Sequence, residues 1–220
     1  MQGIKVIVFD FDGVIVRLSE LIKRGAWGFV ANHPDIGSRV AIAQGEEYAK
    51  KIEGGRRDVL EFSFRQLGVA DKEIRPLINK HAEIYNKIVQ EGILALGVDP
   101  EDRRALRDLS RRYNLYINSG TPEEKLNGTV NALGLTHYFK GVYGQPNKKT
   151  QNLDWVMQRE DVFPAEILFI GDGDIDYIAA DVFGCQFLGL ANTWNGWGTQ
   201  KKNHSFQLIF NLSDIKNHLK

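Results

Sequence analysis

Short apolar runs rich in β-branched and aromatic residues recur along the chain. The first covers residues 4–9 and ends at Asp10. Four later runs are similar: residues 115–117, 167–170, 187–190 and 206–210. Runs of this length, bounded by polar or turn residues, predict buried β-strands.

Helical patterns lie between and after the later runs. They cover residues 122–133, 150–158, 175–183 and 213–219. Each is roughly as long as a helix that connects two parallel strands must be. Strands that alternate with helices predict a parallel sheet covered on both faces. The predicted fold class is therefore α/β, with a Rossmann-like parallel sheet as its core.

The stretch from residue 19 to residue 92 does not follow this alternation. Apolar residues recur there at helical spacing, as Leu60, Phe64 and Leu67 do, and the stripe continues over residues 74–89. Such spacing without a convincing strand predicts a purely helical region.

This helical region is an insertion placed directly after the first strand. Ser119, at the end of the next predicted strand, follows Asp10 by 109 positions, whereas a βαβ unit needs only about 30 or more. We therefore expect a core of residues 1–18 and 93–220 and a helical cap of residues 19–92.

Composition and charge narrow the class of protein. The 220 residues include 28 Lys and Arg against 28 Asp and Glu, a balance that disfavours binding to nucleic acid or to a membrane surface. The single cysteine, Cys185, cannot form an intramolecular disulfide and fits a reducing compartment. No segment approaches the roughly 20 apolar residues of a membrane span. We expect a cytoplasmic protein.

Aspartates gather at two predicted strand ends. Asp10 and Asp12 follow the first strand, and Asp172 and Asp176 follow the strand of residues 167–170. Carboxylates brought together repel one another, so a cation must be present or a pKa must rise. Oxygen ligands without His or Cys favour Mg²⁺. One such pair alone would more often cap a helix, but two pairs at one sheet edge predict a magnesium site.

A hydroxyl group and a lysine complete the candidate chemistry. Ser119 and Gly120 end the second strand, where a hydroxyl and free backbone N–H groups can hold phosphoryl oxygens. Lys148 and Lys149 stand before a predicted helix, and a cation there can neutralise a transferring phosphoryl group. Taken singly, Ser119 could equally be a helix cap, and either lysine could be solvated surface.

These four elements, in this order, resemble the haloacid dehalogenase-like superfamily in its phosphatase branch. Residues 10–14 are similar to its first motif, Ser119 to its second, Lys149 to its third, and Gly171-Asp172 with Asp176 to its fourth. The family spacing from Gly144 selects Lys149 over Lys148. The helical insertion resembles the family's helical cap, as in phosphoglycolate phosphatase and β-phosphoglucomutase relatives.

The resemblance implies a phosphatase mechanism. Asp10 would attack phosphorus and form an aspartyl-phosphate, while Asp12 would act as the general acid and then as the general base. Mg²⁺ would be held by the carboxylates of Asp10 and Asp172 and by the main-chain carbonyl of Asp12. Ser119, Gly120 and Lys149 would hold the phosphoryl group of a small phosphorylated metabolite, and Asp176 would order water or Lys149 without touching the metal. An acid at position 12 disfavours dehalogenation.

Two alternatives remain open. The first is a phosphomutase of the same fold, because Arg56 followed by Leu60 distantly resembles a cap motif of the β-phosphoglucomutase relatives. Arg56 in any case lies in a cap loop with two cations and is a candidate substrate contact. The second is a non-catalytic receiver-like signalling module, which also gathers aspartates, a hydroxyl and a lysine. A receiver needs no large helical insertion and would have no use for Asp12.

Two further features of the sequence are its histidines and Arg17. The five histidines show no metal-ligand spacing, so no histidine site is expected. Arg17 occupies a position where many relatives of the family place an acidic residue, which leaves the substrate pocket, but not the chemistry, open.

Overall fold

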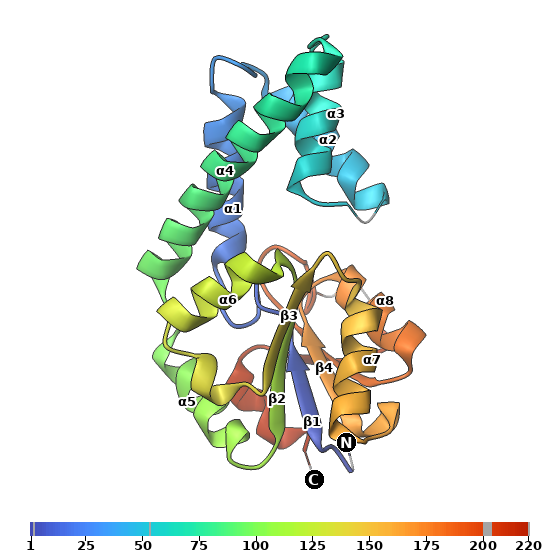
Figure 1. Ribbon diagram of the computed structural model, residues 1–220. Coiled ribbons are helices and arrows are strands. Elements are labelled where there is room, and N and C mark those ends of the chain that lie inside the picture. The colour runs from blue at the N-terminus through green and yellow to red at the C-terminus, as the bar shows by residue number, and fades with distance from the viewer. Residues whose placement is uncertain (2, 53, 200–203, 220) are drawn as a thin grey trace. The chain divides into compact units, whose positions relative to one another are not determined.

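The computed structural model describes residue 1 and residues 3–52, 54–199 and 204–219. The chain divides into two compact units. One comprises Met1–Leu18 and Leu96–Lys220, and the other comprises Ser19–Ala95. We refer to them as the α/β unit and the helical unit (Figure 1).

The α/β unit is built on one six-stranded sheet in the order β3-β2-β1-β4-β5-β6. All neighbouring strands pair in parallel. The strands are β1 (Val6–Phe9), β2 (Asn114–Pro122), β3 (Gly141–Gln145), β4 (Ile167–Gly171), β5 (Gln186–Leu190) and β6 (Gln207–Ile209). Every residue of β1 and β4 is buried, as a strand covered on both faces must be. The predicted α/β fold with a Rossmann-like sheet is confirmed.

Four helices cover the two faces of this sheet: α5 (Pro100–Ser110), α6 (Glu123–Ala132), α7 (Lys149–Glu160) and α8 (Asp174–Phe183). Helices α5 and α6 lie on one side, and α7 and α8 lie on the other (Figure 1). Leu153 of α7 and Ala180 of α8 pack in one apolar cluster with Val8 and Phe169 of the sheet. Because the chain changes sides between β1 and β4, ligands are expected beyond the carboxyl ends of these central strands.

Two details of the α/β unit differ from the prediction. Strand β3 was not predicted, because its residues include two glycines and its side chains are half-buried at the sheet edge. The expected helix of residues 213–219 is instead a 3₁₀ helix, Leu212–Asn217. Its Leu212 N–H donates to the buried carboxylate of Asp102 on α5 at 3.2 Å, which anchors the start of this short segment to the helix. Two more 3₁₀ turns span Thr136–Tyr138 and Pro164–Glu166.

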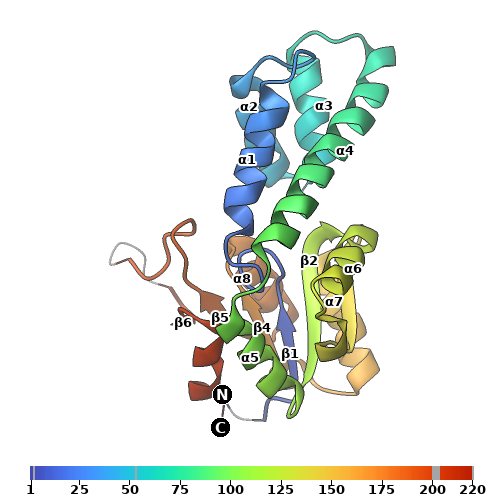
Figure 2. The same ribbon diagram turned by 90° about the vertical axis from the view of Figure 1, so that its left-hand side faces the viewer.

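The helical unit contains α1 (Ser19–Ala31), α2 (Arg39–Lys51), α3 (Arg56–Gln66) and α4 (Asp71–Leu96). Helices α1 and α4 run side by side in both views (Figures 1 and 2), and the rings of Trp27 and Tyr85 meet at 4.3 Å between centroids. The predicted apolar stripe is divided between α3 and α4, and Leu67 is 40% exposed rather than part of the core. Helix α4 continues past residue 92, the expected end of the cap, to Leu96.

Arg17 has a structural role in the α/β unit. Its guanidinium donates to the side chain of Asn211 at 2.8 Å and to the carbonyl of Phe210 at 3.0 Å. Asp102 lies 4.0 Å away. Arg17 thus connects the segment after β1 to the segment after β6.

None of the helices in the described part of the chain is long and apolar enough to cross a membrane.

Candidate active site

Asp10 lies at the carboxyl end of β1, the central strand of the sheet. Its backbone N–H donates to the carbonyl of Ile170 at 2.8 Å, which continues the ladder between β1 and β4. Its side chain accepts the N–H of Phe11 at 2.8 Å. Asp10 is 8% exposed, and this hydrogen bond holds its buried carboxylate in one orientation.

Asp172 follows β4 and meets the turn after β1. Gly13 in that turn has a φ of +75°, and a Cβ atom at its position would lie 2.0 Å from Oδ2 of Asp172. Only glycine combines this conformation with this close approach. The apposition of the two strand ends thus depends on the absence of a side chain at residue 13.

Asp176 reaches the same place from the first turn of α8. Its Oδ2 accepts the N–H of Gly173 at 3.0 Å, which caps the helix. Its other oxygen, Oδ1, contacts the ammonium group of Lys149. Asp176 is 2% exposed, and a carboxylate buried to this degree requires the paired cation.

Lys149 is the first residue of α7, and its amine lies between two carboxylates. Nζ is 3.1 Å from Oδ1 of Asp10 and also contacts Asp176. The carbonyl of Lys149 accepts from the side chain of buried Asn118 at 2.9 Å, which fixes the start of the helix against β2. Lys148, by contrast, is the N-cap residue, and its N–H donates to Gln151. The structure therefore brings Lys149 to the aspartates.

Electrostatics at this site are dominated by burial. Burial raises the pKa of Asp10 well above its ordinary value; the carboxylate of Asp176 raises it further, Lys149 lowers it, and Asp172 and Asp12 add smaller increases. Burial alone would lower the pKa of Lys149, but Asp10 and Asp176 raise it above its ordinary value. The single ammonium group of Lys149 does not cancel the repulsion between Asp10 and the neighbouring carboxylates.

Asp12 and Ser119 both accept a hydrogen bond from Thr121 near the end of β2. Oδ2 of Asp12 accepts a hydrogen bond from Oγ1 of Thr121 at 3.1 Å, and Asp12 is 7% exposed. Ser119 is 2% exposed, and its Oγ accepts the N–H of Thr121 at 3.1 Å. Gly120, next to it on β2, is exposed. Thr121 was not among the predicted residues, although its position at a strand end could have suggested it.

Three carboxylates form a group that fits a divalent cation. Asp10, Asp172 and Asp176 each offer one oxygen, and these oxygens lie within 4.8 Å of one another. The donors are all oxygen, as Mg²⁺ prefers, and the neighbouring carboxylates add to the effect of burial in raising the pKa of Asp10. Asp176, predicted to act without touching the metal, lies in this group, and its role toward a metal stays a prediction.

Two asparagines that the prediction did not include hold Asp172. The side chain of Asn192 donates to Oδ2 of Asp172 at 2.7 Å. The side chain of Asn195 donates to the main-chain carbonyls of Asp172 and Leu190, each at 2.9 Å. Both follow β5, so the rule that ligands gather beyond strand ends would have found them had it been applied to that strand.

Arg56, the predicted substrate contact, begins α3 in the helical unit. Its guanidinium contacts the side chain of Asn86 and lies 5.6 Å from the ring centroid of Tyr85. Its role toward a substrate stays a prediction.

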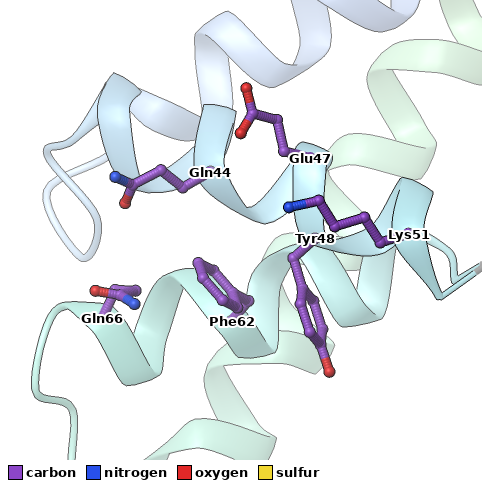
Figure 3. A pocket seen from close by; sticks show the side chains of 6 residues that line it. All are labelled: Gln44, Glu47, Tyr48, Lys51, Phe62 and Gln66. Carbon is purple, nitrogen blue, oxygen red and sulfur yellow. The ribbon is translucent and has the colours of Figure 1, made fainter.

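The helical unit also has a surface pocket of about 270 Å³ between α2 and α3 (Figure 3). The rings of Tyr48 and Phe62 stack there at 4.8 Å between centroids. The full lining is Gln44, Glu47, Tyr48, Lys51, Phe62 and Gln66. This lining includes none of the predicted site residues.

Comparison with known proteins gives related sequences and similar folds. The phosphoglycolate phosphatase of Vibrio parahaemolyticus is 25% identical over 203 residues, which cover 88% of this chain and 86% of that protein. A hydrolase of haloacid dehalogenase type from Bacillus subtilis, solved with magnesium bound, superposes with a TM-score of 0.69 at 16% identity over 98% of both chains. A β-phosphoglucomutase from Clostridium difficile has a TM-score of 0.69 at 17% identity, over 98% of this chain and 94% of its own.

The two solved structures, at these identities, show a shared fold. The family assignment rests on a model of the haloacid dehalogenase-like hydrolases, which matches residues 4–184. That match spans all three clustered aspartates and Lys149, and it confirms the resemblance inferred from the motifs. The chain belongs to the haloacid dehalogenase-like hydrolase family.

Proposed function

We propose that the protein is a Mg²⁺-dependent phosphatase that hydrolyses a small phosphorylated metabolite through an aspartyl-phosphate intermediate. The α/β unit would supply the chemistry, and Asp10 would be the nucleophile. The relatives named phosphoglycolate phosphatase make 2-phosphoglycolate the first substrate to test.

In the first step, an oxygen of Asp10 attacks phosphorus and the bond from phosphorus to the leaving oxygen breaks. Asp12 donates its proton to that oxygen, so the product departs as an alcohol. The Thr121 hydroxyl, 3.1 Å from Asp12, orients the acid. Ser119, the backbone at Gly120, and Lys149 hold the phosphoryl oxygens and offset their charge.

In the second step, Asp12 accepts a proton from water, and the water oxygen attacks phosphorus. The bond from phosphorus to Asp10 then breaks, and phosphate is released. Asp12 is thereby protonated for the next cycle.

The carboxylates of Asp10 and Asp172 and the main-chain carbonyl of Asp12 would hold Mg²⁺, with Asp176 close to the same position. When bound, Mg²⁺ supplies positive charge that offsets the carboxylates and the phosphoryl group. Asn192 orients Asp172 for this task through its hydrogen bond. The ammonium group of Lys149 pairs with Oδ1 of Asp10 and helps to hold that carboxylate in place.

The observation that carries this proposal is the buried Asp12, two residues after Asp10 and hydrogen-bonded by Thr121. A receiver-like module would use Asp10 and Lys149 but has no task for an oriented acid at residue 12. Asp12 serves a phosphomutase equally well, so that alternative differs only in the fate of the phosphoryl group.

Phosphate release across a panel of metabolites tests the proposal. The panel contains 2-phosphoglycolate, several sugar phosphates and a generic aryl phosphate, each with Mg²⁺ or with excess EDTA, and the Asp10→Asn variant is the control. We expect release only with Mg²⁺ and Asp10. Isomerisation of a hexose phosphate, dependent on a hexose bisphosphate and without phosphate release, would identify a phosphomutase instead. A long-lived phosphorylated protein without turnover would identify a receiver.

A further inference from the structure

A second group of potential metal ligands lies wholly within the helical unit. His33 and Asp35 belong to the segment between α1 and α2, and His81 lies on α4. One ligand atom from each lies within 4.8 Å of the others. The sequence showed no histidine spacing typical of a metal site, because residues 35 and 81 are brought together only by folding.

The three side chains converge on one carboxylate oxygen. Nε2 of His81 is 2.9 Å from Oδ2 of Asp35, and Nδ1 of His33 is 3.5 Å from the same oxygen. A tetrahedral zinc ion with bonds of about 2.0–2.1 Å separates its ligand atoms by about 3.3 Å. The two distances to Asp35 lie on either side of that value, and the ligand atoms of the two histidines lie within 4.8 Å of each other.

The packing around His81 holds one ligand of this group in a fixed position. His81 is fully buried, and its ring packs 5.6 Å from that of Phe64 and 4.6 Å from that of His33, measured between centroids. His33 and Asp35 are partly exposed, with side-chain exposures of 24% and 27%. An ion could therefore enter from the solvent side while one ligand is already held in place.

Lys80 shares the carboxylate of this group. Its ammonium donates to Oδ2 of Asp35 at 2.8 Å, the same oxygen that His33 and His81 approach. A divalent cation bound here would therefore take the place of Lys80 on Asp35.

We propose that His33, Asp35 and His81 form a zinc-binding site in the helical unit, separate from the carboxylate cluster of the α/β unit. Two imidazole nitrogens and one carboxylate oxygen, with water as a fourth ligand, are a donor set typical of zinc and not of magnesium. Lys80 is 50% exposed, and its ammonium would swing into solvent when the ion binds. The ion would tie the segment after α1 to α4 and stabilise the helical unit.

Zinc titration of the full-length protein tests this site. With Mg²⁺ in excess, we expect one equivalent of zinc to be lost in His33→Gln and in His81→Gln, or its dissociation constant to rise at least about 10-fold. His137→Gln is the matched control, because His137 is exposed and lies outside the group. Zinc bound to the carboxylate cluster would persist in both His33→Gln and His137→Gln, so only the equivalent that depends on His33 is counted.

Thermal unfolding supplies a second readout. Zinc at about 100 times its dissociation constant should raise the Tm of the parent by about 5–10 °C and leave that of His33→Gln unchanged. His33 is only partly buried, so this variant should fold without zinc, as circular dichroism will verify. The proposal is overturned if the parent binds no zinc in excess Mg²⁺, or if His33→Gln binds zinc as the parent does.

Lys80→Ala separates a metal site from a hydrogen-bonded network. At a metal site, Lys80 competes with the ion for Asp35, so its removal should tighten zinc binding severalfold. Weaker binding in Lys80→Ala than in the parent would contradict the proposal.

Discussion

Asp10 in the α/β unit and Asp35 in the helical unit are both aspartates surrounded by charged neighbours, yet their pKa values move in opposite directions. Asp10 is buried among other carboxylates, and its pKa is raised. Asp35 is partly exposed and accepts from Lys80 and His81, and its pKa is lowered to about 2. The carboxylates around Asp10 outnumber the one ammonium group beside them. The carboxylate of Asp35, by contrast, already accepts hydrogen bonds from Lys80 and His81.

This difference shows what each group needs from an ion. At Asp10 a cation would offset a repulsion that the fold creates, whereas at Asp35 a cation must replace Lys80 and rearrange existing hydrogen bonds. The α/β unit should therefore depend on its metal for activity, and the helical unit should depend on its metal only for added stability.

The largest expected effect is the loss of turnover in Asp10→Asn. An amide is not a nucleophile, so phosphate release with Mg²⁺ should fall at least about 10³-fold. Retained activity would exclude Asp10 as the attacking group.

The same variant should be more stable than the parent in EDTA. A raised pKa means that the folded state keeps a proton that the unfolded chain releases, so the parent loses stability as pH rises from about 4 through the raised pKa of Asp10. The amide introduced by Asp10→Asn cannot ionise, and each kcal/mol of relieved repulsion should raise Tm by about 2–4 °C. An equal or lower Tm at pH 7 would mean that the ion pair with Lys149 outweighs the burial of Asp10.

Lys149→Met should lower kcat by about 10²–10³-fold, because in the proposed mechanism its ammonium offsets the charge of the transferring phosphoryl group. Lys148→Met is the matched control, since Lys148 is the N-cap residue of α7 and its backbone N–H, which the substitution keeps, donates to Gln151. Steady-state kinetics of both variants measure the contrast. Similar small losses in the two would reject the assignment of Lys149.

Asn192→Ala should raise the Mg²⁺ concentration needed for half-maximal activity by about 10–100-fold. The variant removes the 2.7 Å hydrogen bond that orients Asp172, and such partners of a metal ligand typically contribute this much to affinity. Asn217→Ala, at an exposed position in the C-terminal 3₁₀ helix, serves as the control. If kcat at saturating Mg²⁺ falls and the Mg²⁺ requirement does not change, Asn192 does not act through the metal site.

Thr121→Val should lower kcat by about 5–10-fold, which corresponds to one hydrogen bond of about 1–1.5 kcal/mol. The hydroxyl donates to Asp12, which is the acid in the proposed mechanism, so Thr121→Ser should retain most of the rate. A full rate in Thr121→Val would show that Asp12 needs no such partner.

Asp35→Asn in EDTA should have the smallest effect. Because the folded-state pKa of Asp35 is about 2 and its ordinary value is 3.8, the ion pair contributes stability above about pH 4 that is lost as pH falls toward 2. The variant lacks this contribution, which should lie near the 0.2–1 kcal/mol or so typical of exposed pairs. Urea unfolding from pH 2 to pH 6 should show the two proteins converging at the acid end, and a constant difference would contradict this origin.

The alternation of strands and helices was readable from the chain, because short β-branched runs need burial on both faces and helices must cover them. Strand β3 could not be predicted from the sequence, since its Gly141 and Gly144 belong to no apolar run. The ligand group at Asp10 and Asp172 was predictable because parallel strands bring their carboxyl ends to one edge, whatever the details of packing.

The fold class, the order of the motifs and the aspartates at the strand ends all follow from the chain alone, since each depends on local pattern and on a topological rule. Three contacts depend instead on how the elements pack: Lys149 with Asp10, Asn192 with Asp172, and Asp35 with His81. They join residues 139, 20 and 46 positions apart, and no local periodicity encodes which side chains become neighbours across such distances. Packing between elements selects them, because a rotation of one helix by a single residue exchanges one neighbour for another.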